Sequence, residues 1–323
     1  MKLTAPLDIQ TADDLFDFWA DIFGCGVDPD LPKHVFTGSE SSHNRNVVYI
    51  EKENGVIAAT CGITAPLKIS DIGGFGEVAT DPSFRRKGLA TKLSNLAVND
   101  FRTNGGEALF LGTGNPEAAR IYHRLGWRKI SGASVMVNIT SNKSPEEYLV
   151  ERFGKLDNFT VGESSPIARI PMIPLLINPH DWHVLDANAG MFSTRYDIQN
   201  SCMGLYRRYS YIKADGNGEW FTAATNDEKI VGISSALLLN KDVCQIDGFS
   251  HKRFQDCWSE LIDGAIKWAC TKGVSRVCAK ISIEDEEKNA LFSGMGFTVS
   301  NRTDKFEYGE REIESVELLR DVR

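Results

Sequence analysis

Hydrophobic positions in the first 140 residues follow two different periods. Over residues 15–23 they recur every three to four residues, which predicts an amphipathic helix capped at Thr11, with aspartates in its first turn. Two apolar runs come next, and the Asn54-Gly55 dipeptide between them predicts a tight hairpin turn. The predicted strands cover residues 46–51, 56–63, 77–80, 108–112 and 127–138, and the next predicted helices begin at Leu89 and Pro116.

The same order of elements returns in the second half of the chain. The ends of the two halves correspond, because Gly296-Phe297 answers Gly126-Trp127 and Phe292 falls opposite Tyr122. A repeat of this length indicates two similar domains rather than a solenoid. The predicted second-half elements are a strand over 167–177, a helix from about Asp181, strands over 220–224, 230–239 and 243–249, a helix over 257–270, a strand over 276–283 and a short helix around Leu291.

Helices and strands mixed in this order indicate an α+β or α/β fold rather than an all-helical or all-β one. Two domains also suit a chain of 323 residues, at about 150 residues per domain. Residues 141–166 are polar and charged and separate the two repeats. We therefore expect domains at residues 1–140 and 167–323, joined by a connector over 141–166.

Charge and apolar content narrow the class of protein. The net charge of −8 argues against a dedicated nucleic-acid binder and weakly favours a cationic small-molecule partner. The N-terminus lacks the continuous apolar region of a signal peptide. The apolar stretch 171–177 is far shorter than the roughly 20 residues that a membrane-spanning helix needs. We therefore expect a cytoplasmic protein without a membrane partner.

Cysteine and histidine positions do not predict a metal site. The seven cysteines form no Cys-x-x-Cys pair, and their odd number is typical of reduced thiols. His180 and His183 have the spacing of metal ligands, but they open the helix predicted from Asp181 and have no further ligands nearby in the sequence. We therefore expect no metal cofactor.

A loop before the helix at Leu89 combines a glycine with positive charge. It joins the predicted strand 77–80 directly to that helix, so that backbone N–H groups and the positive end of the helix converge. Gly88 lets a ligand approach the backbone without a Cβ in the way. Such a loop is suited to a pyrophosphate, although taken alone it is more typical of a solvated basic turn. Full positive charges come from three consecutive residues, Arg85, Arg86 and Lys87.

A second motif lies one predicted strand further along the chain. It reads Asn115-x-x-Ala118, then Tyr122, then Gly126-Trp127. Together with Arg85-x-x-Gly88-x-Ala90, it resembles the GNAT superfamily of acyl-CoA-dependent N-acetyltransferases, whose pyrophosphate loop reads Arg/Gln-x-x-Gly-x-Gly/Ala. The resemblance covers about residues 1–140 well and 167–310 only in outline. It implies an α+β fold of two tandem GNAT-like domains, each a mostly antiparallel central sheet flanked by helices.

The resemblance also implies a role for each matching residue. Acetyl-CoA is the expected cosubstrate, with its pantetheine along the strand that ends at Thr80 and with the backbone N–H of Val78 near the thioester oxygen. Tyr122 is the expected general acid toward the CoA sulfur, because a phenol is protonated at neutral pH. The expected cofactor-binding residues are Val78, Ala79, Thr80, Arg85, Arg86, Lys87, Gly88, Leu89, Ala90, Asn115, Ala118 and Tyr122.

The group that takes the proton of the amine stays open at this point. Glu77 is the first candidate because it adjoins Val78. Many GNAT members carry a glutamate earlier on this strand, where this chain has no acid at residues 72–76. A water relay and the C-terminal carboxylate at Arg323 are the alternatives, and a buried structural role is the competing interpretation of Glu77.

The second half lacks the features of the first. Its counterpart of the loop, residues 247–258, has no Arg-x-x-Gly-x-Ala and is shorter before its helix. Phe292 stands opposite Tyr122 and cannot donate a proton. We therefore expect one acetyl-CoA site, in the first domain. The degenerate second domain is expected to act as a scaffold and a wall of the substrate cleft.

These observations predict an N-acetyltransferase that moves an acetyl group from acetyl-CoA to a primary amine of a small, cationic molecule. The amine would attack directly in a ternary complex. Two alternatives remain open: acetylation of a protein lysine or N-terminus, and a non-catalytic acyl-CoA-binding regulatory protein.

Overall fold

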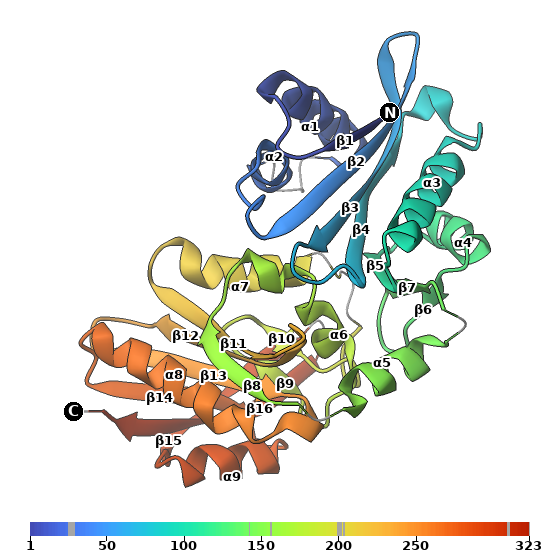
Figure 1. Ribbon diagram of the computed structural model, residues 1–323. Coiled ribbons are helices and arrows are strands. Elements are labelled where there is room, and N and C mark those ends of the chain that lie inside the picture. The colour runs from blue at the N-terminus through green and yellow to red at the C-terminus, as the bar shows by residue number, and fades with distance from the viewer. Residues whose placement is uncertain are drawn as a thin grey trace. The chain divides into compact units, whose positions relative to one another are not determined.

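The computed structural model describes residues 1–24, 30–141, 143–155, 157–198, 202, 204–308 and 311–322. The chain forms two compact units (Figure 1). The first unit comprises Met1–Ile130 and Ser134–Tyr148, with Cys202. The second comprises Ser131–Ala133 and most of the chain from Leu149 onward. Each unit contains its own seven-stranded sheet, flanked by helices, so the fold is α+β.

The sheet of the first unit has the strand order β1-β2-β3-β4-β5-β7-β6. All neighbouring strands are antiparallel except β4 and β5, which run parallel. The strands are β1 (Lys2–Thr4), β2 (Asn44–Glu53), β3 (Val56–Pro66), β4 (Ile72–Thr80), β5 (Ala108–Gly112), β6 (Arg128–Lys129) and β7 (Val135–Ile139). The helices are α1 (Ile9–Phe23), α2 (Asp30–Thr37), the 3-10 turn η1 (Pro82–Phe84), α3 (Leu89–Thr103) and α4 (Pro116–Arg124).

The second unit has a sheet of order β15-β16-β14-β13-β12-β11-β8 and a small sheet of β9 and β10. Its main strands are β8 (Phe159–Glu163), β11 (Gly218–Thr225), β12 (Ile230–Leu238), β13 (Val243–Ser250), β14 (Arg276–Ser282), β15 (Thr298–Tyr308) and β16 (Arg311–Asp321). The small sheet pairs β9 (Val184–Asp186) with β10 (Met191–Phe192). The helices are α6 (Met172–Ile177), α7 (Gly204–Ala214), α8 (Cys257–Thr271) and α9 (Glu286–Gly294), with 3-10 turns η2 (Pro166–Arg169) and η3 (Lys252–Phe254). Helix α5 (Pro145–Gly154) leads from the first unit into the second along the chain.

The two main sheets have the same strand order when one is read backwards. β8 takes the place of β1, β11 that of β2, and so on to β15 in the place of β6. In each sheet the single parallel pair, β4–β5 or β13–β14, lies at the same position. This agreement is consistent with a tandem duplication. Strand β8 belongs to the second sheet although it lies within residues 141–166, which the sequence marks as a connector.

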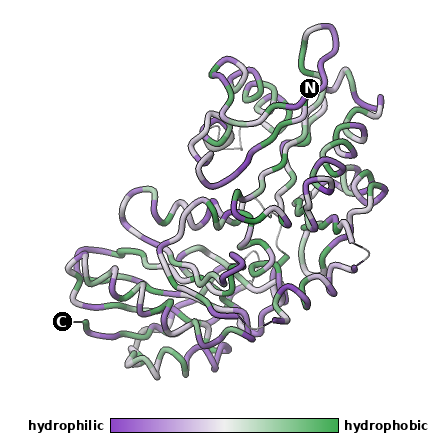
Figure 2. The backbone as a smooth tube through the Cα atoms, viewed as in Figure 1, coloured by the Kyte–Doolittle hydropathy of each residue, from purple (hydrophilic) through white to green (hydrophobic). Residues whose placement is uncertain are grey.

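Alternate residues of β2 pack on opposite faces of the first sheet, as the period of a strand requires. Val47 and Tyr49 join a core cluster with residues of α3 and α4. Val48 and Ile50 join a second cluster with Leu15 of α1. Hydrophobic residues accordingly recur along the strands in Figure 2. None of the described helices is both long enough and apolar enough to cross a membrane.

Several sequence predictions about elements are confirmed. Asn54 and Gly55 have positive φ angles of 52° and 84° and connect β2 to β3, as the hairpin prediction requires. Asn115 caps α4, with Pro116 at its first position. Cys61, Cys244, Cys257, Cys270 and Cys278 are thiols outside any disulfide, and Cys25 lies outside the described residues.

Other predicted elements were wrong. The run 167–177 forms η2 and α6 rather than a strand, and every residue of α6 is buried, so the run has no polar period that could separate a helix from a strand. No helix begins at Asp181, because an irregular segment there leads into strand β9 at Val184. Helix α1 begins at Ile9, since the N-cap is Asp8, whose carboxylate accepts the N–H of Thr11 at 2.9 Å. The strand predicted over 127–138 is split into β6 and β7.

A segment of the second unit fills the fork between β13 and β14. These parallel strands pair only from Val243 to Gln245. Where the pairing ends, the side chain of Asn188 donates to the carbonyl of Gln245 at 3.1 Å. One residue earlier, the N–H of Ala187 donates to the carboxylate of Asp247 at 2.7 Å. Residues 184–190 therefore occupy the space that the diverging strands open.

Lys288 of α9 holds this segment in place. Its ammonium donates to the carbonyls of Val184 and Leu185 at 2.9 and 3.0 Å and pairs with Asp247 at 2.6 Å, and neither charged side chain of the pair is exposed to solvent. Burial raises the pKa of Asp247 to about 7, although Lys288 beside it favours the charged form. Burial also raises the pKa of the neighbouring Asp186. The raised pKa values of Asp186 and Asp247 therefore reduce the net negative charge that these two carboxyls and the Lys288 ammonium carry together at neutral pH.

Replacing Lys288 with methionine should destabilise the second unit by about 3–5 kcal/mol, because it leaves buried carboxyls without their cation. The free energy of unfolding in urea measures this loss. The matched control is Lys252→Met, since the side chain of Lys252 is 83% exposed and pairs with Asp181 at the surface. This control should change stability by no more than about 1 kcal/mol. Equal effects of the two substitutions would contradict the role of Lys288.

Candidate functional site

One cavity of the first unit gathers nearly all of the predicted cofactor-binding residues. Its volume is about 540 Å³, and it opens between the end of β4, the loop before α3 and helix α4. Lys87 is the only predicted cofactor-binding residue that does not line it. The lining residues are Ile22, Phe23, Val78, Ala79, Thr80, Phe84, Arg85, Arg86, Gly88, Leu89, Ala90, Thr91, Asn115, Glu117, Ala118, Ile121 and Tyr122.

The loop before α3 presents backbone N–H groups. Gly88 is the N-cap of α3, with a φ of 78° and no side-chain cap, so the first-turn N–H groups of the helix are left without that partner. Arg86 also has a left-handed φ, of 62°. Left-handed residues that alternate along a loop turn successive N–H groups to one side, as in backbone anion sites. A Cβ built on Gly88 would meet nothing within 4 Å, so the space beside it is open.

The three cations of the loop differ in their surroundings. The guanidinium of Arg85 donates to the carbonyl of Thr80 at 3.2 Å, which fixes it beside the end of β4. The ammonium of Lys87 lies 4.7 Å from the centre of the Phe84 ring and so packs along the loop itself. Arg85 and Arg86 are thus the full positive charges at the cavity, next to the positive end of α3.

A β-bulge in β4 separates this strand from β5. The parallel pairing of β4 with β5 ends at Gly74, and the register with β3 shifts between Thr60 and Gly62. Glu77 at the bulge has a φ of 50°, a left-handed conformation that is costly for a residue with a Cβ. The last part of β4, which includes Val78, is therefore unpaired on its β5 side and lines the cavity.

Tyr122 sits at the inner wall of the same cavity. Its ring packs at 6.2 Å from Phe75 and 6.0 Å from Trp127, and only 7% of the residue is exposed. Burial, and to a lesser extent the neighbouring Cys61, raises the pKa of its phenol well above the usual value. The hydroxyl therefore keeps its proton at neutral pH. Asn115 holds α4 in this position, since its side-chain oxygen accepts the N–H of Glu117 at 2.9 Å.

Glu77 lies beside the cavity rather than in its lining. Its carboxylate packs over Gly62 of β3, where an added Cβ would come within 2.7 Å of the oxygen. Its charge also contributes to the raised pKa of the buried Cys61, for which burial is the larger cause. The bulge residue and the candidate base are thus the same residue. Arg323, the other candidate carboxylate, lies outside the described residues.

The corresponding place in the second unit differs at each of these points. Lys288 has the same position in α9 as Ala118 has in α4. Its long side chain fills the fork between β13 and β14, whereas Ala118 leaves the corresponding fork between β4 and β5 open. β13 pairs with β12 without a register shift, so it has no bulge. Two residues, 255–256, separate η3 from α8, against four, 85–88, between η1 and α3. Phe292 is packed between Trp258 and Phe297, at 4.9 and 5.0 Å.

This contrast shows what the first cavity can accommodate. The first cavity has an open fork, a backbone cradle with two arginines, and a small residue at position 118. These features fit an extended ligand that carries a diphosphate. The described part of the second unit has its own segment at that place.

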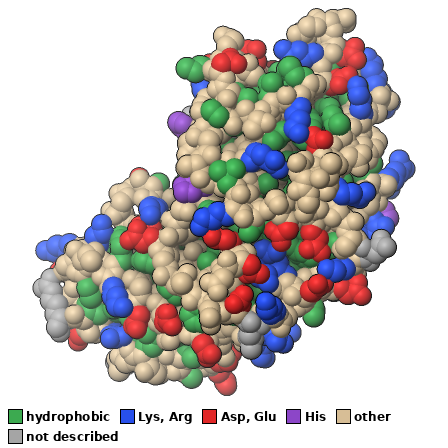
Figure 3. All heavy atoms as spheres, viewed as in Figure 1, with side chains coloured by type: hydrophobic (Ala, Val, Ile, Leu, Met, Phe, Trp, Pro, Cys, Tyr) green, Lys and Arg blue, Asp and Glu red, His purple; other side chains and the backbone are tan. Residues whose placement is uncertain are grey.

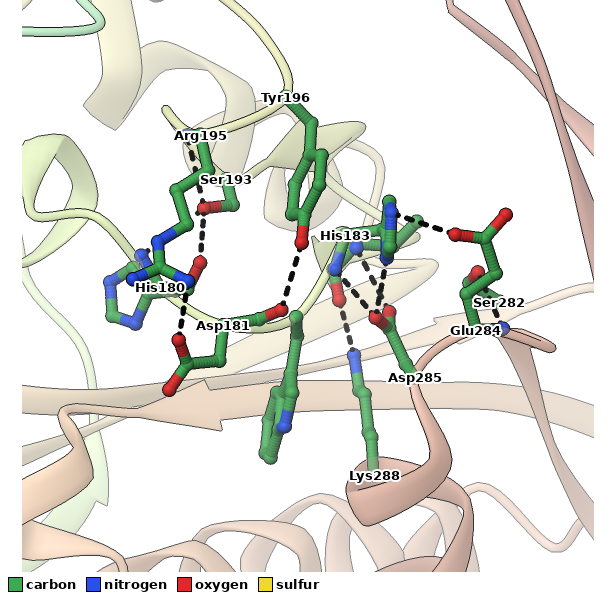
Figure 4. Close-up of polar contacts among 12 residues, drawn as sticks. His180, Asp181, His183, Ser193, Arg195, Tyr196, Ser282, Glu284, Asp285 and Lys288 are labelled. Carbon is green, nitrogen blue, oxygen red and sulfur yellow. Dashed lines mark hydrogen bonds and ion pairs between the residues drawn. The ribbon is translucent and has the colours of Figure 1, made fainter.

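The histidines singled out in the sequence belong to the second unit, and Figure 4 shows the imidazole of His183 beside Asp285 and Glu284. The imidazole of His180 contacts the carbonyl of Leu175 at 2.8 Å. The imidazole of His183 contacts the carboxylate of Asp285 at 3.0 Å. Both residues lie in an irregular segment before β9, not at the start of the helix that the sequence predicts.

Sequence reasoning missed part of the cavity wall. Phe84, Thr91, Glu117 and Ile121 are neighbours of the motif residues, and helical spacing from Ala118 and Tyr122 could have indicated Ile121. Ile22 and Phe23, at the end of α1, also line the cavity, and Phe23 is 44% exposed.

Three solved structures to which this chain is similar are distant from it in sequence. An acetyltransferase of the GNAT family from Streptococcus pneumoniae is 18% identical, with 51% of this chain and all of that chain covered, at a TM-score of 0.39. A phosphinothricin acetyltransferase from Sinorhizobium meliloti in complex with AcCoA is 16% identical, with 51% and 88% covered, at a TM-score of 0.39. A GNAT family acetyltransferase from Elizabethkingia anophelis with acetyl-CoA bound is 16% identical, with 52% and 100% covered, at a TM-score of 0.33. At these values the likenesses carry no argument about the site. No curated protein matches the chain.

Residues 12–127 match the acetyltransferase (GNAT) family. The matched stretch contains the bulge of β4, the loop before α3, and α4 with Tyr122. Residues 12–127 of this chain are therefore similar to the GNAT acetyltransferases.

Proposed function

We propose that the protein is an N-acetyltransferase that moves an acetyl group from acetyl-CoA to a primary amine of a small, cationic molecule. The supporting observation is one cavity that brings together an anion cradle, a free strand edge and a buried, protonated phenol. These are the groups that holding a CoA thioester and protonating its sulfur require.

Acetyl-CoA supplies an acetyl group activated as a thioester. The backbone around Gly88, with Arg85 and Arg86, binds its diphosphate, and the free edge of β4 orients the arm between diphosphate and thioester. The amine nitrogen forms a bond to the acetyl carbon while the carbon–sulfur bond breaks. The sulfur takes a proton from Tyr122 as it leaves, and the proton that the nitrogen loses restores the phenol of Tyr122. The N–H of Val78 stabilises negative charge on the carbonyl oxygen.

An amine must be neutral to attack, so a group at the site must take its proton. Glu77 is the proposed acceptor, because it adjoins Val78, whose N–H is placed at the reacting carbonyl. Its carboxylate packs over Gly62 of β3 and does not line the cavity. A water relay to the same carboxylate is compatible with its position beside the cavity.

The charge of the protein supports a cationic acceptor. The chain has a net charge of −8, and α1, whose last turn lines the cavity, carries Asp13, Asp14, Asp17 and Asp21 and no lysine or arginine. The face in Figure 3 intermixes acidic and basic side chains. This pattern does not favour a nucleic acid as the partner.

Replacing Tyr122 with phenylalanine tests the function and the acid together. Release of free thiol from acetyl-CoA, followed over a panel of amines and peptides, should show turnover with small cationic amines. Tyr122→Phe should lower kcat by about 100-fold, because the leaving thiolate loses its proton donor. The dissociation constant of acetyl-CoA should stay within about twofold, since no cradle group is changed.

Tyr49→Phe is the matched control. It removes a phenol of the same unit that binds Asp100 at 2.8 Å and does not line the cavity. This variant should keep kcat. Turnover with peptides only would favour protein acetylation, and binding without thiol release from any acceptor would favour the regulatory alternative. Unchanged kcat in Tyr122→Phe would remove Tyr122 from its role.

Replacing Arg85 and Arg86 together with alanine should weaken acetyl-CoA binding by about 10- to 100-fold, because charged hydrogen bonds to the diphosphate are lost. Titration calorimetry measures this change. The control is the double replacement of Lys252 and Arg253 with alanine in the counterpart loop of the second unit, which should leave both the affinity and a stoichiometry of about one unchanged. A weaker affinity in this control, or a second site per chain, would contradict the assignment of the cofactor to the first unit.

A further inference from the structure

Two side chains outside the cavity lining, those of Thr60 and Trp19, form hydrogen bonds that hold the peptide group between Glu77 and Val78. The hydroxyl of Thr60, on β3, donates to the carbonyl of Glu77 at 2.6 Å. The indole N–H of Trp19, on α1, donates to the same hydroxyl at 2.9 Å. Thr60 is fully buried and Trp19 is 4% exposed. This Trp19–Thr60 relay connects α1 to the bulge.

The direction of the relay is fixed by its chemistry. An indole N–H can only donate, so the Thr60 oxygen is the acceptor in that contact. The hydroxyl has a single proton, which is then directed at the carbonyl of Glu77. The bulge has taken this carbonyl out of the regular ladder, and burial without a partner would cost about 1–3 kcal/mol. Thr60 therefore holds the carbonyl in one orientation.

A fixed carbonyl also fixes the N–H of the same peptide group. The bond between Glu77 and Val78 is trans, because the one cis bond among the described residues is Ala5–Pro6. In a planar trans peptide the C=O and the following N–H point in opposite directions. Since the carbonyl of Glu77 points to Thr60, the N–H of Val78 points away from Thr60. Val78 itself lines the cavity.

We propose that Thr60 and Trp19 are positioning residues, which aim the N–H of Val78 at the carbonyl oxygen of the bound acyl thioester. The proposal rests on the proposed function, in which that N–H stabilises charge on the oxygen. It adds that catalysis in the cavity depends on a hydroxyl and an indole that do not line it.

Thr60→Val tests the proposal, because valine keeps the shape of threonine and removes the hydroxyl. We expect kcat to fall by about 10- to 100-fold, as a misaligned donor would cause. The preference of the protein for acetyl-CoA over CoA should fall about fivefold, since only the acetyl form offers the carbonyl. The amide resonance of Val78 should shift between the CoA and acetyl-CoA complexes of the wild type, and this difference should vanish in Thr60→Val.

Controls separate positioning from stability. Thr64→Val changes a buried threonine of the same strand, whose hydroxyl donates to Asn46 at 2.8 Å, and should leave all three readouts unchanged. Thr60→Ser should have a kcat close to that of the wild type, because serine keeps the hydroxyl. Trp19→Phe keeps an aromatic ring on α1 and should lower kcat in the same direction, which provides a second variant if Thr60→Val does not fold.

The outcomes distinguish this proposal from the proposed function. If the wild type acetylates amines and a folded Thr60→Val keeps its kcat and its preference for acetyl-CoA, the positioning role is overturned and the function stands. If the wild type acetylates no amine, the function fails. The Val78 resonance then still decides the positioning role, which is supported if the shift depends on Thr60 and overturned if it does not.

Discussion

The extra residue in β4 is the constraint on which the rest of the cavity depends. Thr80 lies six residues beyond the last parallel pair at Gly74, whereas Ser250 lies five beyond Gln245 in the second unit. The additional residue is accommodated by the left-handed Glu77, at a cost of about 1–2 kcal/mol. The hydrogen bond from Thr60 offsets about 1 kcal/mol of that cost. A strained backbone that its surroundings hold in place is typical of functional positions.

The two units show how one scaffold supports an open or a filled fork. Both sheets share their strand order, and both have parallel strands that pair over three residues and then diverge. In the first unit Ala118 leaves the fork open, and the longer loop before α3 presents its N–H groups there. In the second unit Lys288 binds the chain's own segment 184–190 at that place. The first unit, with Ala118, thus has an open cavity, and the second unit, with Lys288 at the same helical position, has a packed core.

Much of the first unit could be predicted from the sequence, because local chemistry determines it. Asn-Gly and Asn-Pro dipeptides set a hairpin and a helix start, and two short motifs selected residues that the fold brings to one cavity. The bulge could not be predicted, since glutamate has no preference for a left-handed conformation. In the Trp19–Thr60 relay, Thr60 is 41 positions from Trp19 and 17 positions from Glu77. No local sequence pattern could therefore indicate it. The run 167–177 was misjudged because a fully buried helix and a buried strand are equally apolar.

The most direct measurement is a crystal structure of the protein grown with acetyl-CoA. We predict density for the diphosphate at the first turn of α3, the pantetheine along the free edge of β4, and the thioester oxygen within hydrogen-bonding distance of the N–H of Val78. The segment 184–190 should stay in the fork of the second unit. Density for the ligand in the second unit, or a loop at residues 85–88 closed on its own side chains with the ligand elsewhere, would contradict the assignment of the acyl donor to the first unit.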